Sequence, residues 1–158
     1  MAETVATILL FCYPIRGLPG CPAGVTIRGT GWSELTYNTT ANTWSWATGG
    51  TGPSVREFTA GASSATGMTI FGGLNGTGAG TAVNDEGLLA DTWTWTPGSF
   101  WSAAACTPCN PSPPASAGAA MAYQRATSQG YFYGGYTDTA PPAAPTATWI
   151  WTGTGWQG

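Results

Sequence analysis

The sequence predicts an all-β protein built from repeated sheet units. Apolar and aromatic residues alternate with small or polar ones over short stretches, which is the period of two that is typical of strands. No stretch shows the sustained 3.6-residue apolar stripe of a helix, so we expect almost none. A Thr-Trp-x-Trp element occurs three times, at Thr43–Trp46, Thr92–Trp95 and Thr148–Trp151. Successive copies lie roughly 50 residues apart, a spacing that is typical of propellers and solenoids.

The composition supports a folded domain and excludes two classes of partner. Of 158 residues, 13% are aromatic and 7% are charged, and 24 Gly and 12 Pro supply the turns that many short strands require. The formal net charge is −3, with no Lys and no His. Four scattered Arg provide no electrostatic footprint for a phosphate backbone, so we expect no nucleic-acid partner. No apolar stretch is long enough to cross a bilayer, so we expect no membrane partner.

Residues 1–31 do not match the repeat and form an irregular N-terminal segment in the prediction. Prolines divide this segment into pieces no longer than a strand. The apolar stretch Thr7–Tyr13 favours a strand over a non-native leader, and a secretory signal matches poorly because Glu3 precedes it rather than Lys or Arg. A second strand is expected at Val25–Ile27. The compartment is not identified, and an extracellular or cell-surface location is favoured over others.

The first unit, residues 32–52, is short. We expect a strand at Trp32–Tyr37, a turn at Asn38–Asn42, and then the first Thr-Trp-x-Trp element. No Gly-Gly pair precedes Trp44, as one does in the two later units, so this unit is predicted to be degenerate or incomplete.

The second unit, residues 53–101, is fuller. A strand is expected through Ala60–Ser64, followed by a turn at 65–67 and a strand at Met68–Phe71. Gly72-Gly73 then leads through a Gly/Thr/Asn loop to Thr92–Trp95. Within that loop, Val83–Leu89 is the least strand-like stretch and is expected to be a short helix or a projecting loop.

The third unit, residues 112–156, repeats the order. A strand at Ala117–Tyr123 is followed by a polar reversal and the aromatic strand Tyr131–Tyr133, which is predicted to end abruptly at Gly134-Gly135. Thr148–Thr152 alternates again and places both of its Trp on one face, whereas Trp156 is expected to begin a new element. Neither face of these strands is polar, so the sheet is predicted to be covered on both sides.

Over residues 42–156 this order of motifs resembles the Kelch repeat, in which each copy forms one four-stranded propeller blade. The shared features are a hydrophobic strand, Gly-Gly, a variable loop and two spaced aromatics. The run Ala120–Tyr123 is similar to the Ala-Met-Ala-Tyr run of Trp-rich bacterial members. The resemblance implies a Kelch-like β-propeller with about three four-stranded blades in this chain.

Propellers have four to eight blades, so three blades leave an open arc. If each open face exposed about 500 Å² of apolar surface, covering it would be worth on the order of 12 kcal/mol. That gain is as large as the net stability of a whole domain. We therefore predict a homodimer that closes a six-bladed ring, an arrangement that also allows one strand to be exchanged between the chains. The alternative is that the sequence is a piece of a longer chain.

Two of the four cysteines, Cys106 and Cys109, form a C-x-x-C pair in a loop. We expect a loop-stapling disulfide or two inert thiols. The alternatives are half of a zinc site, which without His would need Cys12 and Cys21 or carboxylates, and a redox pair. Cys106 is also a catalytic candidate, as a thiolate.

The absence of His excludes ordinary Ser/His/Asp and Cys/His catalysis, so a general acid or base must be a carboxylate, a Tyr or a Cys. Asp85, Glu86 and Asp91 form the one acidic cluster, and Asp138 is an isolated second candidate. We expect solvated loop carboxylates; calcium is conceivable, although the alternating pattern of a calcium loop is missing. No cofactor is predicted, with zinc and calcium as the alternatives.

Four residues are candidates for ligand binding, on the expectation that ring-face loops and residues around the axis bind ligands in the family that the chain resembles. Trp101 and Trp156 are aromatics that could stack on sugar rings or apolar ligands, and Tyr136 lies beyond the second Gly-Gly. Arg56 stands where the family often carries an Arg. Its side chain is expected either to make an interblade hydrogen bond or to face the central cavity.

The sequence therefore predicts a binding module whose ligand is a glycan, a protein or a small molecule. The alternative is a hydrolase of esters or phosphoesters with a metal or a Cys/carboxylate site in the ring pocket or at the subunit interface. A third reading is a purely structural segment of a larger surface protein.

Overall fold

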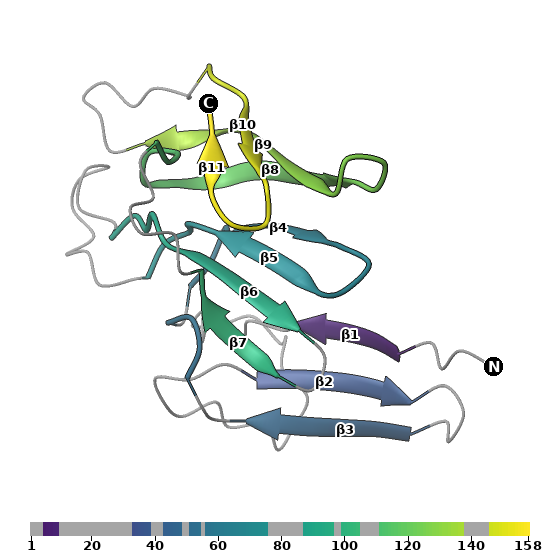
Figure 1. The fold of residues 1–158 in the computed structure, drawn as a ribbon. Helices are drawn as coiled ribbons and strands as arrows, with labels where there is room; N and C mark the ends of the chain where they lie inside the picture. The colour runs from purple at the N-terminus through teal and green to yellow at the C-terminus, as the bar shows by residue number, and fades with distance from the viewer. Residues whose placement is uncertain are drawn as a thin grey trace. The chain divides into compact units, whose positions relative to one another are not determined.

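The described part of the chain forms eleven β-strands and contains no helix, which confirms the all-β prediction (Figure 1). A computed structural model covers residues 1–158. It describes residues 5–9, 33–38, 43–48, 51–54, 56–75, 87–96, 99–104, 111–137 and 146–158. These residues hold no helix long and apolar enough to cross a membrane. The chain divides into two units, Met1–Val55 and Arg56–Gly158, which are described separately.

The first unit contains one three-stranded antiparallel sheet in the order β1-β2-β3. Its strands are β1 (Val5–Leu9), β2 (Ser33–Asn38) and β3 (Thr43–Thr48). The N-terminal strand thus begins before Thr7, and it pairs with β2. The first Thr-Trp-x-Trp element lies in β3, where the backbone of Trp44 pairs with Tyr37. The strand expected at Val25–Ile27 lies outside the described residues.

The second unit contains two four-stranded antiparallel sheets. The first has the order β4-β5-β6-β7 and consists of β4 (Ala60–Ser63), β5 (Met68–Phe71), β6 (Thr92–Thr96) and β7 (Phe100–Ala103). A tight turn joins β4 to β5, in which the backbone N–H of Ser64 donates to the Gly67 carbonyl at 2.7 Å. The strands and the turn predicted for this stretch are therefore found where they were expected.

The second sheet has the order β11-β10-β9-β8 and consists of β8 (Ser116–Gln124), β9 (Gln129–Thr137), β10 (Trp149–Trp151) and β11 (Trp156–Gln157). One prediction is wrong here. The aromatic strand does not end at Gly134-Gly135: both glycines adopt positive φ, 78° and 83°, and β9 continues past them to Thr137. Trp156 begins a new element as expected, the strand β11, which pairs with β10 and completes this sheet.

The two four-stranded sheets have the same register, which shows them to be two copies of one unit. Ala60 pairs with Phe71 as Ala120 pairs with Tyr133. At the other edge, β6 and β7 bring two Trp side by side, and β10 and β11 do the same. The pairs are Trp95 with Trp101, and Trp151 with Trp156.

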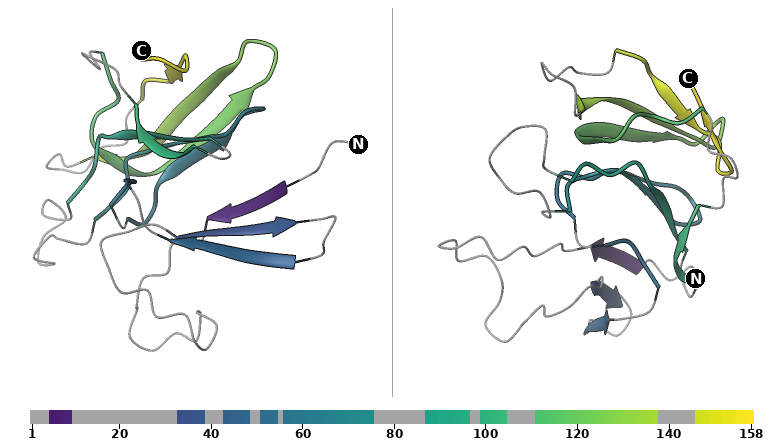
Figure 2. Two further views of the ribbon diagram at one scale, coloured as in Figure 1. Left: turned by 60° about the horizontal axis from the view of Figure 1, so that its bottom comes forward. Right: turned by 90° about the vertical axis from the view of Figure 1, so that its left-hand side faces the viewer.

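The two sheets of this unit stack face to face, as Figure 2 shows, around an aromatic cluster. The Phe71 ring meets Phe132 and Trp156 edge-on, with ring centroids 5.1 and 5.2 Å apart. Ala60, 3% exposed, lies in the same core. Edge-to-face pairs at this separation add stability beyond the area that they bury. Trp151 and Trp156 therefore contribute to the packing between the two sheets.

Backbone hydrogen bonds also tie the innermost parts of the two sheets together, and they require glycine at one position. The Gly73 N–H donates to the Ser116 carbonyl at 2.9 Å, and the Gly118 N–H donates to the Phe58 carbonyl at 2.8 Å. Gly72 has a φ of 66°, and a Cβ at this residue would overlap the Ser116 carbonyl oxygen. The first Gly of the motif thus allows the two sheets to approach each other.

Candidate functional site

A groove of about 340 Å³ opens between the two stacked sheets of the second unit. Its walls come from the β4–β5 and β8–β9 ends of the sheets and from the Trp-bearing strands. Its lining residues are small, hydroxylated or aromatic: Ala62, Ser64, Thr66, Gly67, Met68, Thr69, Thr94, Trp95, Thr96, Met121, Tyr123, Ser128, Gly130, Trp151 and Gly153.

Local turn geometry shapes the walls of this groove. A Cβ at Gly67 would overlap the Trp95 carbonyl oxygen, so the β4–β5 turn can lie against β6 only with glycine there. A Cβ at Gly130 would come within 2.7 Å of the Met121 methyl group. Two glycines thus allow the turn and the hairpin to pack closely against their neighbours.

The lining of the groove carries hydroxyls and aromatic rings but no carboxylate, guanidinium or amine among its described residues. Some hydroxyls already have partners: Ser64 Oγ donates to the Gly67 carbonyl at 3.2 Å, and Thr94 Oγ1 lies 3.0 Å from Ser102 Oγ. Hydroxyls can still accept further hydrogen bonds through their remaining lone pairs. The surface suits an uncharged polar ligand, because a charged ligand would lose hydration without gaining a counter-charge.

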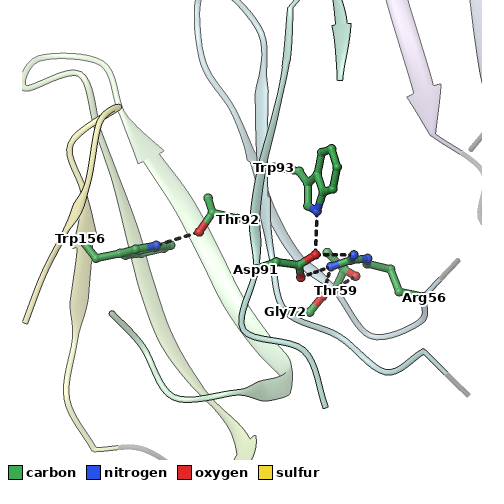
Figure 3. Close-up of polar contacts among 7 residues, drawn as sticks. All are labelled: Arg56, Thr59, Gly72, Asp91, Thr92, Trp93 and Trp156. Atoms are coloured by element: carbon green, nitrogen blue, oxygen red, sulfur yellow. Dashed lines mark hydrogen bonds and ion pairs between the residues drawn. The ribbon is translucent and has the colours of Figure 1, made fainter. Parts of the chain in front are cut away.

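A second polar centre lies within the β4–β7 sheet, around the carboxylate of Asp91 (Figure 3). The Arg56 guanidinium donates to both of its oxygens, Nη1 to Oδ1 at 2.6 Å and Nη2 to Oδ2 at 2.8 Å. Trp93 Nε1 donates to Oδ2 at 2.6 Å. Arg56 Nη1 also donates to the Gly72 carbonyl at 3.0 Å. This bidentate, charge-assisted arrangement ties the segment before β4 to the start of β6.

These contacts set the charge state of Asp91. Burial of the carboxyl raises its pKa, but the hydrogen bonds from Arg56 and Trp93 and the positive charge of Arg56 together lower the pKa below its ordinary value. Asp91 is therefore a carboxylate at neutral pH and would be a poor general acid. The cluster has the properties of a structural brace.

The structure does not bring the four ligand-binding candidates together in the groove. The Arg56 side chain has no exposed surface and is held by Asp91. Trp101 and Trp156 are 4% and 5% exposed, and Trp156 forms part of the core. Tyr136 is half-buried and lies opposite Ala117 in the sheet. None of the four lines the groove.

The catalytic and metal candidates lie mostly beyond the part of the chain that the structure describes. Asp85, Glu86, Asp138, Cys106 and Cys109 all fall outside the described residues. Within those residues, no three His, Cys, Asp or Glu side chains gather into a group that could hold a metal ion.

Sequence reasoning missed the groove residues, because the groove is made by turns and strand ends from two sheets. Ser128 lies in the β8–β9 turn and Thr96 at the end of β6, more than thirty residues apart in the chain. One feature points toward them: Thr alternates with Trp in the Thr-Trp-x-Trp elements, so the face of the strand opposite its two indoles carries hydroxyls.

Comparisons with known proteins identify no family for this chain. No family model matches it, and no curated protein matches it. Among solved structures, one described as "Structure of YjhT" is 22% identical, with a TM-score of 0.46. The match covers 68% of this chain and 28% of that one, so the chain spans less than a third of that protein's length.

Proposed function

We propose that the chain is a ligand-binding module built from Kelch-type propeller blades, with the inter-sheet groove as its binding site. Two features of the described residues support the blade assignment. The β4–β7 and β8–β11 sheets share one register, and each carries a Gly-Gly pair and a Trp pair at matching positions. The groove itself carries the binding proposal, since it is a concave site between repeated layers.

The chemistry of the groove favours a neutral, hydroxyl-rich ligand such as an uncharged glycan. Hydroxyl side chains exchange hydrogen bonds with sugar hydroxyls in either direction, since each group both donates and accepts. The partly exposed side chains of Met121 and Tyr123 offer apolar surface for the C–H faces of a sugar ring. A cavity of about 340 Å³ lies at the lower end of the range for small-molecule sites.

Titration calorimetry with a panel of neutral and acidic oligosaccharides tests this proposal. We expect neutral glycans to bind and their acidic counterparts to bind at least tenfold more weakly. Thr96→Arg places a long cation at the groove wall and should weaken neutral-glycan binding at least tenfold. Thr154→Arg is the matched control, because Thr154 is an exposed turn residue that does not line the groove. No neutral glycan binding, or equal effects of the two variants, would reject the groove as the site.

A further inference from the structure

The face of the β8–β11 sheet that points away from the aromatic core is uncharged: alanine, tyrosine and isoleucine side chains share it with Gln124, Gln129 and Gln157. Direct cross-strand pairing places Ala120 opposite Tyr133, and Tyr131 opposite both Ala122 and Ile150. Residues paired in this way share one face of a sheet. We call this set, Ala120, Ala122, Tyr131, Tyr133 and Ile150, the Tyr133 face.

The Tyr133 face is open to solvent. Tyr133 is 56% exposed, both alanines are exposed, and Tyr131 and Ile150 are half-buried. The neighbouring residue Phe132 points to the opposite face and is 1% exposed in the aromatic core. Tyrosine is enriched and charged residues are depleted at the centres of protein interfaces.

The same face of the sister sheet is covered. In the β4–β7 sheet the matching positions to Ala120 and Tyr133 are Ala60 and Phe71, which pair in the same register. These two are 3% and 1% exposed, because the Phe132 and Trp156 side of the next sheet packs on them. The molecule therefore contains both an occupied and an unoccupied copy of one docking face.

We propose that the Tyr133 face docks a second copy of this chain, which contributes a Thr-Trp-x-Trp sheet. The occupant of the internal copy is a Trp-bearing sheet of this chain, so a similar sheet is the complementary surface. The β1–β3 sheet carries a further Thr-Trp-x-Trp element with matching backbone register. Tyr37 pairs with Trp44 there as Ile70 pairs with Trp93 in the β4–β7 sheet.

A hydrogen-bonding position is also repeated. Between the stacked sheets, the hydroxyl of Thr92 accepts a hydrogen bond from the indole of Trp156 at 2.9 Å. The residue in the same place before the next Trp-x-Trp is Thr148, which is exposed. Thr148 thus offers an exposed hydroxyl at the position that Thr92 occupies inside the chain. Two copies, each receiving the other's β1–β3 sheet on its Tyr133 face, form a closed dimer about a two-fold axis.

Sedimentation velocity over micromolar concentrations tests the proposal on the full chain. We expect twice the single-chain mass of 16.2 kDa. Tyr133→Arg places a cation at the centre of the face and should raise the dimer dissociation constant at least tenfold. Phe58→Arg is the matched control, because Phe58 is another strongly exposed aromatic residue, at 63%, and is not on the Tyr133 face. It should leave the dimer unchanged.

Near-ultraviolet circular dichroism of the Trp cluster shows whether each variant is folded. If Tyr133→Arg is unfolded, Ala122→Arg on the same face replaces it, with the same expected loss of dimer. A wild-type chain that sediments at the single-chain mass throughout overturns the proposal. So does a folded face variant that dimerises as tightly as the wild type, or an equal loss of dimer in Phe58→Arg.

Discussion

The indole Nε1 of Trp156 donates a hydrogen bond to the hydroxyl of Thr92 at 2.9 Å, across 64 residues of sequence and between two sheets. Both residues are buried, at 5% and 6% exposure. A buried donor without a partner costs more than a formed hydrogen bond gains, so this contact favours one alignment of the stacked sheets over others. The Trp156 ring also packs edge-on against Phe71, which joins the polar and aromatic contacts.

Removing the acceptor should destabilise the stack. Thr92→Val keeps the shape of the side chain but leaves the Trp156 indole N–H buried and unpaired, so we expect a loss of about 1–3 kcal/mol in the free energy of unfolding. Urea denaturation measures it. Thr94→Val on the same strand is the control and should cost less than about 0.5 kcal/mol, because the Thr94 hydroxyl bonds at an exposed position. Equal losses in the two variants would count against the role of the Thr92 hydroxyl.

The two residues of the Arg56–Asp91 pair should differ in how much stability their removal costs. The Arg56 guanidinium has no exposed surface, and Asp91→Ala removes its carboxylate partner. We therefore expect Asp91→Ala to lower the free energy of unfolding by about 3 kcal/mol. Arg56→Met should cost less, because the Asp91 side chain is 42% exposed and can be hydrated, and Trp93 still donates to it. Chemical denaturation of both variants at neutral pH gives the comparison. A larger loss for Arg56→Met would contradict the arrangement.

The lowered pKa of Asp91 predicts part of the acid sensitivity of the fold. In the unfolded chain the carboxyl has its ordinary pKa, about 4. The folded value is lower, so the stabilisation is fully present above about pH 4 and is lost as pH falls through the folded pKa. The difference in unfolding free energy between the wild type and Asp91→Asn should therefore be constant near neutral pH and shrink in acid. A difference that grows in acid would have the wrong sign.

Gly72 and Gly153 form a matched pair of glycines with positive φ, 66° and 96°. Alanine at Gly153 meets no atom within 4 Å and should cost only the backbone strain, about 1–2 kcal/mol. Alanine at Gly72 adds a clash with the Ser116 carbonyl oxygen and should cost clearly more. Thermal denaturation of both variants tests this. Similar losses would show that the close approach of the two sheets at Gly72 is not needed.

Alternation of apolar and polar residues along the sequence predicts individual strands. It does not predict which strands pair when they are far apart in the sequence. The strand at Met68–Phe71 and the turn before it follow from neighbouring residues alone. The strand β11 cannot be predicted in this way, because a strand of two residues is too short to show alternation. Trp156 joins the sheet through its pairing with Trp151. The pair Gly134-Gly135 predicts a strand end because glycine is a common turn residue, whereas β9 runs through both glycines in one register until Thr137 pairs with Ser116.

The candidate site was harder still to predict. Arg56 was identified as a notable cation, but its partner Asp91 lies 35 residues away, and the sequence held no sign of which carboxylate it would meet. The groove depends on the relative positions of turns from two sheets. The packing of the aromatic cluster between the sheets determines those positions, and the sequence pattern does not show it.

Hydrogen exchange of the indole N–H groups, observed by NMR, is the most direct test of the stacking of the two repeated sheets through Trp156. The Trp156 resonance is assigned by its disappearance in Trp156→Phe. We predict that this N–H exchanges orders of magnitude more slowly than a solvent-exposed indole and shows nuclear Overhauser contacts to the Phe71 and Phe132 rings. Exchange at the rate of a free indole, with no such contacts, would contradict the account.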